Sequence, residues 1–118
     1  MSIIGTKAIE VTILDTASLS AAVELKGFSV DRIIMPAAWD AADLTFQFSD
    51  DGGTTFQNAY WDWGAEMVVD AAAAITIELS PFVRLNRIDQ LKVRSGTAAV
   101  PVVTTADRTI ILSVSARG

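Results

Sequence analysis

The sequence contains no cysteine and no histidine. Without cysteine the chain forms no disulfide, iron–sulfur cluster, thiol nucleophile or cysteine-ligated zinc site. Without histidine it has no Ser-His-Asp triad, no HExxH metal site and no imidazole that titrates near neutral pH. Because these two absences remove most common enzyme chemistry, we expect no catalytic residue, no metal ligand and no cofactor.

Long apolar runs are also missing. No apolar stretch approaches the roughly 20 residues that span a bilayer, and the best one, 68–77, is interrupted by Asp70. The first seven residues lack a basic segment followed by an apolar one, so no signal peptide is predicted. A net charge of −5 disfavours broad contact with nucleic acid or an anionic membrane. We therefore expect neither a membrane nor a nucleic-acid partner.

Charged residues are scarce. They make up 19% of the chain, against about 25% in typical soluble domains. A small domain with few charges must cover its surface with alanine, threonine and serine, or bury that surface against partners. The 118 residues suit a single domain over 1–118. Composition leaves two alternatives open, a solvated monomer and a subunit of an assembly.

The few charges are unevenly distributed. Residues 31–70 carry a net charge of −7, and residues 84–117 carry +4. The bases of the second segment are Arg84, Arg87, Lys92, Arg94, Arg108 and Arg117. Either the two segments lie side by side and neutralise each other, or they form complementary faces that steer neighbouring copies together.

Alternating apolar and polar residues predict a chain built of strands. The nine predicted strands are 7–13, 22–26, 30–35, 44–48, 56–61, 66–69, 75–79, 88–94 and 109–114. Asp50-Asp51-Gly52-Gly53-Thr54 lies between the fourth and fifth strands and predicts a hairpin turn. Segments 37–43 and 71–74 could each form a short helical turn. A strand about every ten residues predicts an all-β fold, an antiparallel sandwich or barrel.

Acidic residues provide the weakest candidates for chemistry. Five aspartates could offer oxygen ligands to Ca²⁺ from loops at one end of a sandwich, namely Asp40, Asp43, Asp50, Asp51 and Asp62. The EF-hand spacing is absent, and Asp-Gly is mainly a turn former. Asp62 and Glu66 could in principle serve as a glycosidase pair, but nothing in the sequence indicates the required separation. Neither a metal site nor an enzyme is predicted.

Aromatic residues cluster at Phe56, Tyr60, Trp61 and Trp63. Tyr60 and Trp61 are adjacent on a predicted strand, so they should face opposite sides, one toward the core and one toward solvent. An exposed tyrosine or tryptophan can stack on a sugar ring or anchor a protein partner. Packing in the core or at an interface is favoured over a glycan platform.

Two longer stretches carry a family resemblance. Residues 33–56 (IIMPAAWDAADLTFQFSDDGGTTF) and 91–102 (LKVRSGTAAVPV), followed by a strand at 107–114, resemble small accessory virion proteins of tailed phages and prophages. That group includes head decoration or cement proteins, head-spike bases and tail-associated proteins. Within the first stretch, 46–52 followed by Phe56 resembles a hairpin of discoidin-like, galactose-binding sandwiches. The resemblance implies a single antiparallel β-sandwich, jelly-roll or discoidin-like, with about eight to nine strands.

The same resemblance implies a non-enzymatic virion structural protein. We expect a capsid decoration or cement protein, made in the bacterial host cytoplasm, that binds and stabilises the head lattice as a homo-oligomer, a trimer being one option. Its partners would be the major capsid protein, other virion proteins and further copies of itself. The alternative is a carbohydrate-binding module of the tail or head spike, with a glycan as partner. The candidate contact residues are Trp39, Asp40, Tyr60, Trp61, Trp63, Arg94 and Val100.

Overall fold

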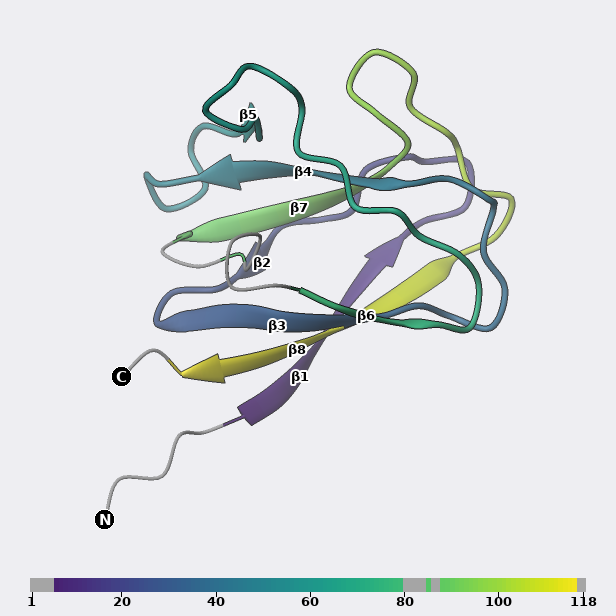
Figure 1. Cartoon of the computed structure of the whole chain (residues 1–118), viewed down its shortest axis with the longest axis horizontal. Coiled ribbons are helices and arrows are strands. Elements are labelled where there is room, and N and C mark those ends of the chain that lie inside the picture. Colours follow the sequence, from purple (N-terminus) through teal and green to yellow (C-terminus); the bar gives the residue numbers. More distant parts are fainter. Residues whose placement is uncertain (1–5, 80–84, 86–87, 117–118) are drawn as a thin grey trace.

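Two four-stranded antiparallel sheets face each other in the computed structural model, which describes residues 6–79, 85 and 88–116 (Figure 1). The strands are β1 (Thr6–Ile13), β2 (Val23–Glu24), β3 (Phe28–Ile34), β4 (Leu44–Ser49), β5 (Gln57–Asn58), β6 (Thr76–Glu78), β7 (Gln90–Ser95) and β8 (Arg108–Ala116). The first sheet has the order β1-β8-β3-β6 and the second the order β2-β7-β4-β5. The all-β sandwich expected from the sequence is confirmed.

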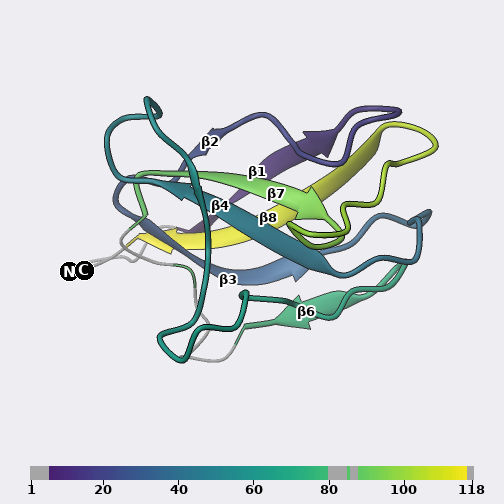
Figure 2. The same ribbon diagram turned by 90° about the horizontal axis from the view of Figure 1, so that it is seen from above.

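The strand pairing is nested. β1 pairs with β8, β2 with β7, β3 with β6 and β4 with β5, and these four pairs alternate between the two sheets. A chain paired in this way is one long hairpin rolled up so that β8 also meets β3 and β7 also meets β4. This is the jelly-roll arrangement. Seen from above, β4 and β7 lie over the strands of the first sheet (Figure 2).

Inward-facing residues of both sheets form the core. Successive side chains of a strand point to opposite faces, so apolar residues two positions apart reach the same interior. In β8 the three alternating residues Ile110, Leu112 and Val114 are fully buried, and in β4 so are Leu44 and Phe46. The alternation predicted at both segments therefore marks the core face.

The β4–β5 hairpin forms at the predicted place. Gly52 and Gly53 have φ values of +75° and +94°, a region that glycine enters without steric cost. The Asp51 carboxylate closes the turn, because its Oδ1 accepts hydrogen bonds from the Ser49 hydroxyl (2.8 Å) and from the amides of Thr54 (3.1 Å) and Thr55 (2.9 Å).

The segment after β5 differs from the prediction. Within the expected strand 56–61 only Gln57–Asn58 forms a strand, and the expected strand 66–69 makes only isolated bridges, Glu66 with Tyr60 and Val69 with Leu44. Residues 59–75 connect an edge of the second sheet to an edge of the first, so they cannot stay in one ladder. The segments 37–43 and 71–74 form bends and turns, and neither contains a helical turn.

The two ends of the sandwich differ. The connections β1–β2, β3–β4, β5–β6 and β7–β8 meet at the end on the right of Figure 1, whereas the β4–β5 hairpin lies at the opposite end. Across 6–79, 85 and 88–116, no helix is long and apolar enough to cross a lipid bilayer. The first five residues, on which the expectation of no signal peptide partly depends, lie outside the described residues, as do Arg84, Arg87 and Arg117.

Candidate functional site

The seven candidate contact residues fall into two groups. Trp39, Asp40 and Arg94 are largely buried and hold loops together, whereas Tyr60, Trp63 and Val100 are 55%, 70% and 68% exposed. Trp61 is half-buried. The exposed residues come from two loops, 59–66 and 96–100, which we call the outer loops because they cover the outer face of the second sheet.

Trp39 and Asp40 fasten the β3–β4 connection. Trp39 packs against the core and donates its Nε1 hydrogen to the carbonyl of Ala42 at 2.8 Å. The Asp40 carboxylate pairs with the Arg108 guanidinium at 2.6 Å and accepts the amide of Thr105 at 2.8 Å. The hydrogen bond from Arg108 holds the pKa of Asp40 below its ordinary value. Both residues therefore serve the fold and offer little surface to a partner.

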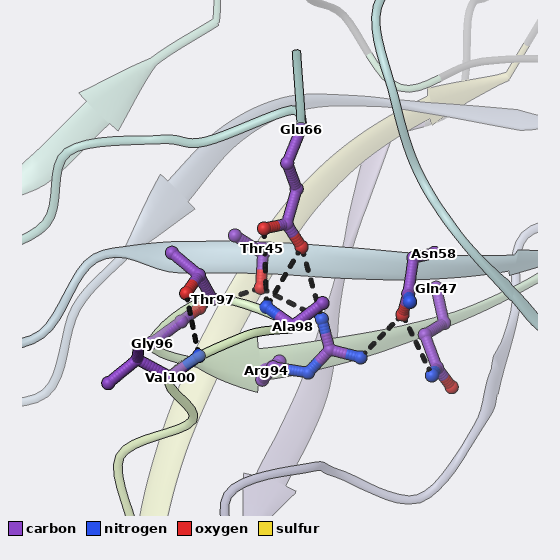
Figure 3. A network of polar contacts seen from close by, with 9 residues as sticks. All are labelled: Thr45, Gln47, Asn58, Glu66, Arg94, Gly96, Thr97, Ala98 and Val100. Carbon is purple, nitrogen blue, oxygen red and sulfur yellow. Dashed lines mark hydrogen bonds and ion pairs between the residues drawn. The ribbon is translucent and has the colours of Figure 1, made fainter. Parts of the chain in front are cut away.

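Arg94 occupies the centre of a polar network on the outer face of the second sheet (Figure 3). Arg94 is only 7% exposed. Nη1 lies 3.3 Å from Glu66 Oε2 and 3.3 Å from Thr45 Oγ1, and Nη2 donates to Asn58 Oδ1 at 2.6 Å. A buried guanidinium requires such partners, since an uncompensated buried charge is costly. Arg94 was expected at an interface, but it is a positioning residue beneath the outer loops.

Glu66 joins the two outer loops. Its carboxylate reaches Arg94 from the connection after β5 and also accepts the amide of Ala98 from the β7–β8 connection, at 3.1 and 3.2 Å. Thr45 of β4 fixes the start of the second outer loop, because its hydroxyl donates a hydrogen bond to the carbonyl of Gly96 at 2.7 Å. The sequence does not indicate this role of Glu66 and Thr45. The alternation of side chains along β4 and β7 places Thr45 and Arg94 opposite each other on the outer face of the sheet. The sequence around these two residues does not indicate that loops cover this face.

The second outer loop is a tight turn that presents Val100. The amide of Thr97 donates to the Val100 carbonyl at 3.1 Å, and the amide of Val100 donates to the Thr97 hydroxyl at 3.0 Å. Gly96 begins the turn with a φ of +88°, and its own amide donates to Asp43 O at 2.7 Å. The backbone hydrogen bonds thus fix the conformation of the loop that carries the exposed side chain of Val100.

The first outer loop presents a stacked pair of tryptophans. The rings of Trp61 and Trp63 lie 5.1 Å apart at an angle of 8°. A turn brings them together, with the amide of Gly64 donating to Trp61 O (3.0 Å) and the amide of Trp61 donating to Ala65 O (2.8 Å). The expectation that either Tyr60 or Trp61 would enter the core is wrong: Tyr60 is exposed and Trp61 is half-buried, because β5 ends at Asn58 and Ala59 is the residue of the following loop that reaches the core.

The five aspartates considered as calcium ligands do not converge. Asp40 and Asp43 lie on the β3–β4 connection, whereas Asp50 and Asp51 lie on the hairpin at the other end of the sandwich. Among the residues described, no group of three or more acidic, histidine or cysteine side chains is placed to hold a metal ion. The Asp51 Oδ1 atom instead accepts the hydrogen bonds that close the turn.

The described part of the chain has a hollow at each end of the sandwich. One, of about 410 Å³, lies beside the β4–β5 hairpin and is lined by Phe48, Asp50, Asp51, Thr55, Gln57, Asn58, Ala59 and Tyr60. The other, of about 390 Å³, lies between the β3–β4 and β5–β6 connections and is lined by Trp39, Ala41, Ala42, Asp43, Ala71, Ala72 and Ala73. The first combines aromatic, carboxylate and amide side chains, whereas the second is largely alanine.

Acid is expected to destabilise the fold through Asp40 and Asp51. The pKa of Asp51 is lowered chiefly by the backbone hydrogen bond from Thr55, and that of Asp40 by Arg108. The native state therefore binds fewer protons than the unfolded state, so this stabilisation is present above the ordinary aspartate pKa and is lost as pH falls below about 4.

Urea unfolding between neutral pH and pH 2 should check this prediction. Asp51→Asn should reduce the fall in unfolding free energy with acid, because the variant has no carboxylate to protonate at the turn. Asp62→Asn is the matched control, since that carboxylate makes no hydrogen bond with any described residue. Identical pH profiles for Asp51→Asn and the unmodified protein would contradict the assignment.

A scan against protein-family models and a search of curated proteins both give no match.

Proposed function

We propose that this chain is a non-enzymatic structural protein of a phage virion, a decoration or cement subunit that docks on the head lattice through its outer loops. The virion assignment is supported by the resemblance of 33–56 and 91–102 to accessory virion proteins. The docking surface is supported by one observation: Trp63 and Val100 are 70% and 68% exposed on loops that a buried ion pair holds in place.

Exposed tryptophan is a costly feature for a surface without a partner. Aromatic side chains bury large areas and dominate the energetics of interfaces, where tryptophan is enriched among the residues that contribute most. Stacking on Trp61 holds the Trp63 ring in place before any contact forms. Since little side-chain or loop freedom remains to be lost, docking would incur a smaller entropic cost.

Repetition would turn modest contacts into strong attachment. A subunit that binds the assembled lattice and not its separate parts stabilises the lattice by mass action. If the chain self-associates, two or more linked copies would bind adjacent sites with an avidity well above that of one copy. This mechanism needs no catalytic residue, consistent with the residue types that the chain lacks.

Binding to heads assembled without this chain tests the proposal. Purified protein should saturate such heads at a copy number that rises in proportion to the number of capsomers, as measured by sedimentation and quantitative mass spectrometry. Analytical ultracentrifugation of the free protein should show self-association. Protein that stays monomeric and leaves empty heads undecorated would refute the decoration role, and a copy number fixed by one vertex would place it at the tail or spike.

Trp63→Ala is expected to weaken binding to the heads by about tenfold or more, because truncating an aromatic anchor typically costs over 1 kcal/mol. Val100→Asp should have a comparable effect by placing a charge on the same surface. Ala73→Asp is the control, since Ala73 is also exposed but lines the hollow near Trp39. If Ala73→Asp abolishes binding while the other two variants bind normally, the outer loops are not the docking surface.

A further inference from the structure

The hollow beside the β4–β5 hairpin has the features of a small-molecule site. Its volume of about 410 Å³ lies within the roughly 300–1,000 Å³ range of ligand pockets. Its lining comes from the end of β4, the hairpin turn, β5 and the first residues of the outer loop 59–66. These are consecutive parts of the chain joined by the hydrogen bonds of the turn, so the hollow forms without contributions from distant loops.

One wall is aromatic. Tyr60 is 55% exposed, and Phe48 is half-buried against the core. An aromatic ring offers an apolar face with negative electrostatic potential. The C–H groups on one side of a saturated ring pack well against such a face. The Tyr60 hydroxyl adds a donor and acceptor at the rim.

Other side chains of the lining are polar and have hydrogen-bonding groups without a partner among the described residues. The side chains of Asp50 and Gln57 make no hydrogen bond or ion pair with any described residue. Asn58 accepts hydrogen bonds at its Oδ1 from Arg94 (2.6 Å) and Gln47 (3.1 Å), which fixes the orientation of its amide. Its Nδ2 hydrogens remain without an acceptor among the described residues. The hollow thus offers both acceptors and donors.

These groups select the class of ligand. Asp50 and Asp51 are the charged residues of the lining, so a phosphate or carboxylate ligand would be repelled. A purely apolar ligand would desolvate Asp50 and Gln57 without giving them hydrogen bonds, which is costly. A neutral sugar ring has an apolar face for Tyr60 and hydroxyls that both donate and accept.

We propose that this hollow binds a neutral sugar residue of a glycan, with Tyr60 as the stacking platform and Asp50, Gln57 and Asn58 as hydrogen-bonding residues. Arg94 is then a positioning residue for Asn58, because it holds the amide from beneath without reaching the sugar. The hollow borders the proposed docking surface, because Ala59 and Tyr60 belong to the outer loop 59–66, but neither Trp63 nor Val100 lines it.

NMR titration of the ¹⁵N-labelled full chain tests the proposal, with galactose, glucose and N-acetylglucosamine as separate probes. At least one sugar, added up to about 100 mM, should give saturable shifts concentrated in residues 48–60, since a single sugar contact of this kind binds weakly. Tyr60→Ala should weaken that binding by about tenfold or more, whereas Tyr60→Phe should retain most of it because the ring remains.

Two further variants separate loss of binding from loss of folding. Gln57→Ala lies on a short edge strand with an exposed side chain, so it should fold normally and still bind the sugar more weakly. Trp63→Ala should bind the sugar as the unmodified chain does, even though it is expected to dock poorly on heads. Failure of the head-binding experiment would therefore not contradict the sugar site. Failure of the sugar titration would likewise not contradict docking on heads.

Several outcomes would overturn the proposal. One is the absence of saturable shifts with all three sugars. A second is a set of shifts that Tyr60→Ala leaves unchanged. A third is a response to CaCl₂ but not to sugar at the same residues, which would make the hollow a cation site.

Discussion

Replacing Gly96 by alanine is expected to destabilise the protein by about 3 kcal/mol or more. Two costs combine at this position. The φ of +88° is strained for any residue with a Cβ. A Cβ built on Gly96 would also lie 2.6 Å from the carbonyl oxygen of Val100 and 2.7 Å from the amide nitrogen of Val102. Backbone atoms cannot rotate away as a flexible side chain can, so the turn itself would have to open.

Gly27 provides a matched control for the clash. Its φ of +84° is nearly the same, but a Cβ there meets nothing within 4 Å. Gly27→Ala should therefore cost only the conformational strain, about 1–2 kcal/mol. Urea unfolding of the two variants measures the difference directly. If both variants lose the same free energy of unfolding, the Gly96 turn accommodates a Cβ without further cost. The outer loop 96–100 would then be less tightly packed than the structure indicates.

Replacing Arg94 by methionine is expected to cost about 3 kcal/mol, the second large effect. The variant removes the positive partner of Glu66, whose side chain is only 14% exposed, and leaves Asn58 and Thr45 with fewer hydrogen bonds. The measured loss would mainly reflect the buried carboxylate left without compensation, not the net value of the pair. The outer loops should also lose order, visible as broadened or shifted resonances near Glu66 and Ala98.

The pair formed by Arg32 and Glu78 is the control for this prediction. Its N–O distance of 2.8 Å is shorter than the 3.3 Å of Arg94 and Glu66, but its side chains are 50% and 63% exposed. Arg32→Met should therefore cost less than about 1 kcal/mol, because water screens and solvates both charges. A double variant, Arg94→Met with Glu66→Gln, should recover part of the loss by removing the unpaired charge. Equal costs for Arg94→Met and Arg32→Met would contradict the structural role of the network.

The uneven charge distribution found in the sequence now has an explanation within the molecule. Glu66 and Asp40 belong to the acidic segment, and their partners Arg94 and Arg108 belong to the basic one. Two of the three described bases of that segment are thus neutralised internally. This favours the first of the two alternatives, in which the segments lie side by side. Contact with the head lattice then depends on the apolar surface of the outer loops, where our docking proposal places it.

Much of the fold could be predicted because its signals are local. Alternation in Thr6–Ile13, Leu44–Ser49 and Arg108–Ala116 follows from the two-residue repeat of a strand, and Gly52 and Gly53 mark the hairpin by their tolerance of positive φ. Both properties depend on near neighbours in the chain. The weaker predictions concerned 56–61 and 66–69, where the chain leaves one sheet for the other and propensity no longer decides the pairing.

The candidate site was only partly accessible from the sequence. Tyr60, Trp63 and Val100 were among the contact candidates chosen from the sequence, and all three are exposed, although Tyr60 was expected on a strand. Arg94 could not be assigned, because a lone arginine at an outward strand position is ordinarily solvated. The hollow at the hairpin also went unrecognised, since Gln57 and Asn58 are unremarkable until their neighbours are known.

The sequence by itself determined the class of fold, the hairpin and the absence of thiol and imidazole chemistry, because residue identity and short-range periodicity suffice for these. Only the tertiary structure decided that Arg94 is buried and that Asn58 is oriented. The physical reason is distance along the chain: the residues that bind the Arg94 guanidinium come from β4, β5 and the outer loop 59–66. Burial of a charge depends on what folds over it, and no local pattern encodes that.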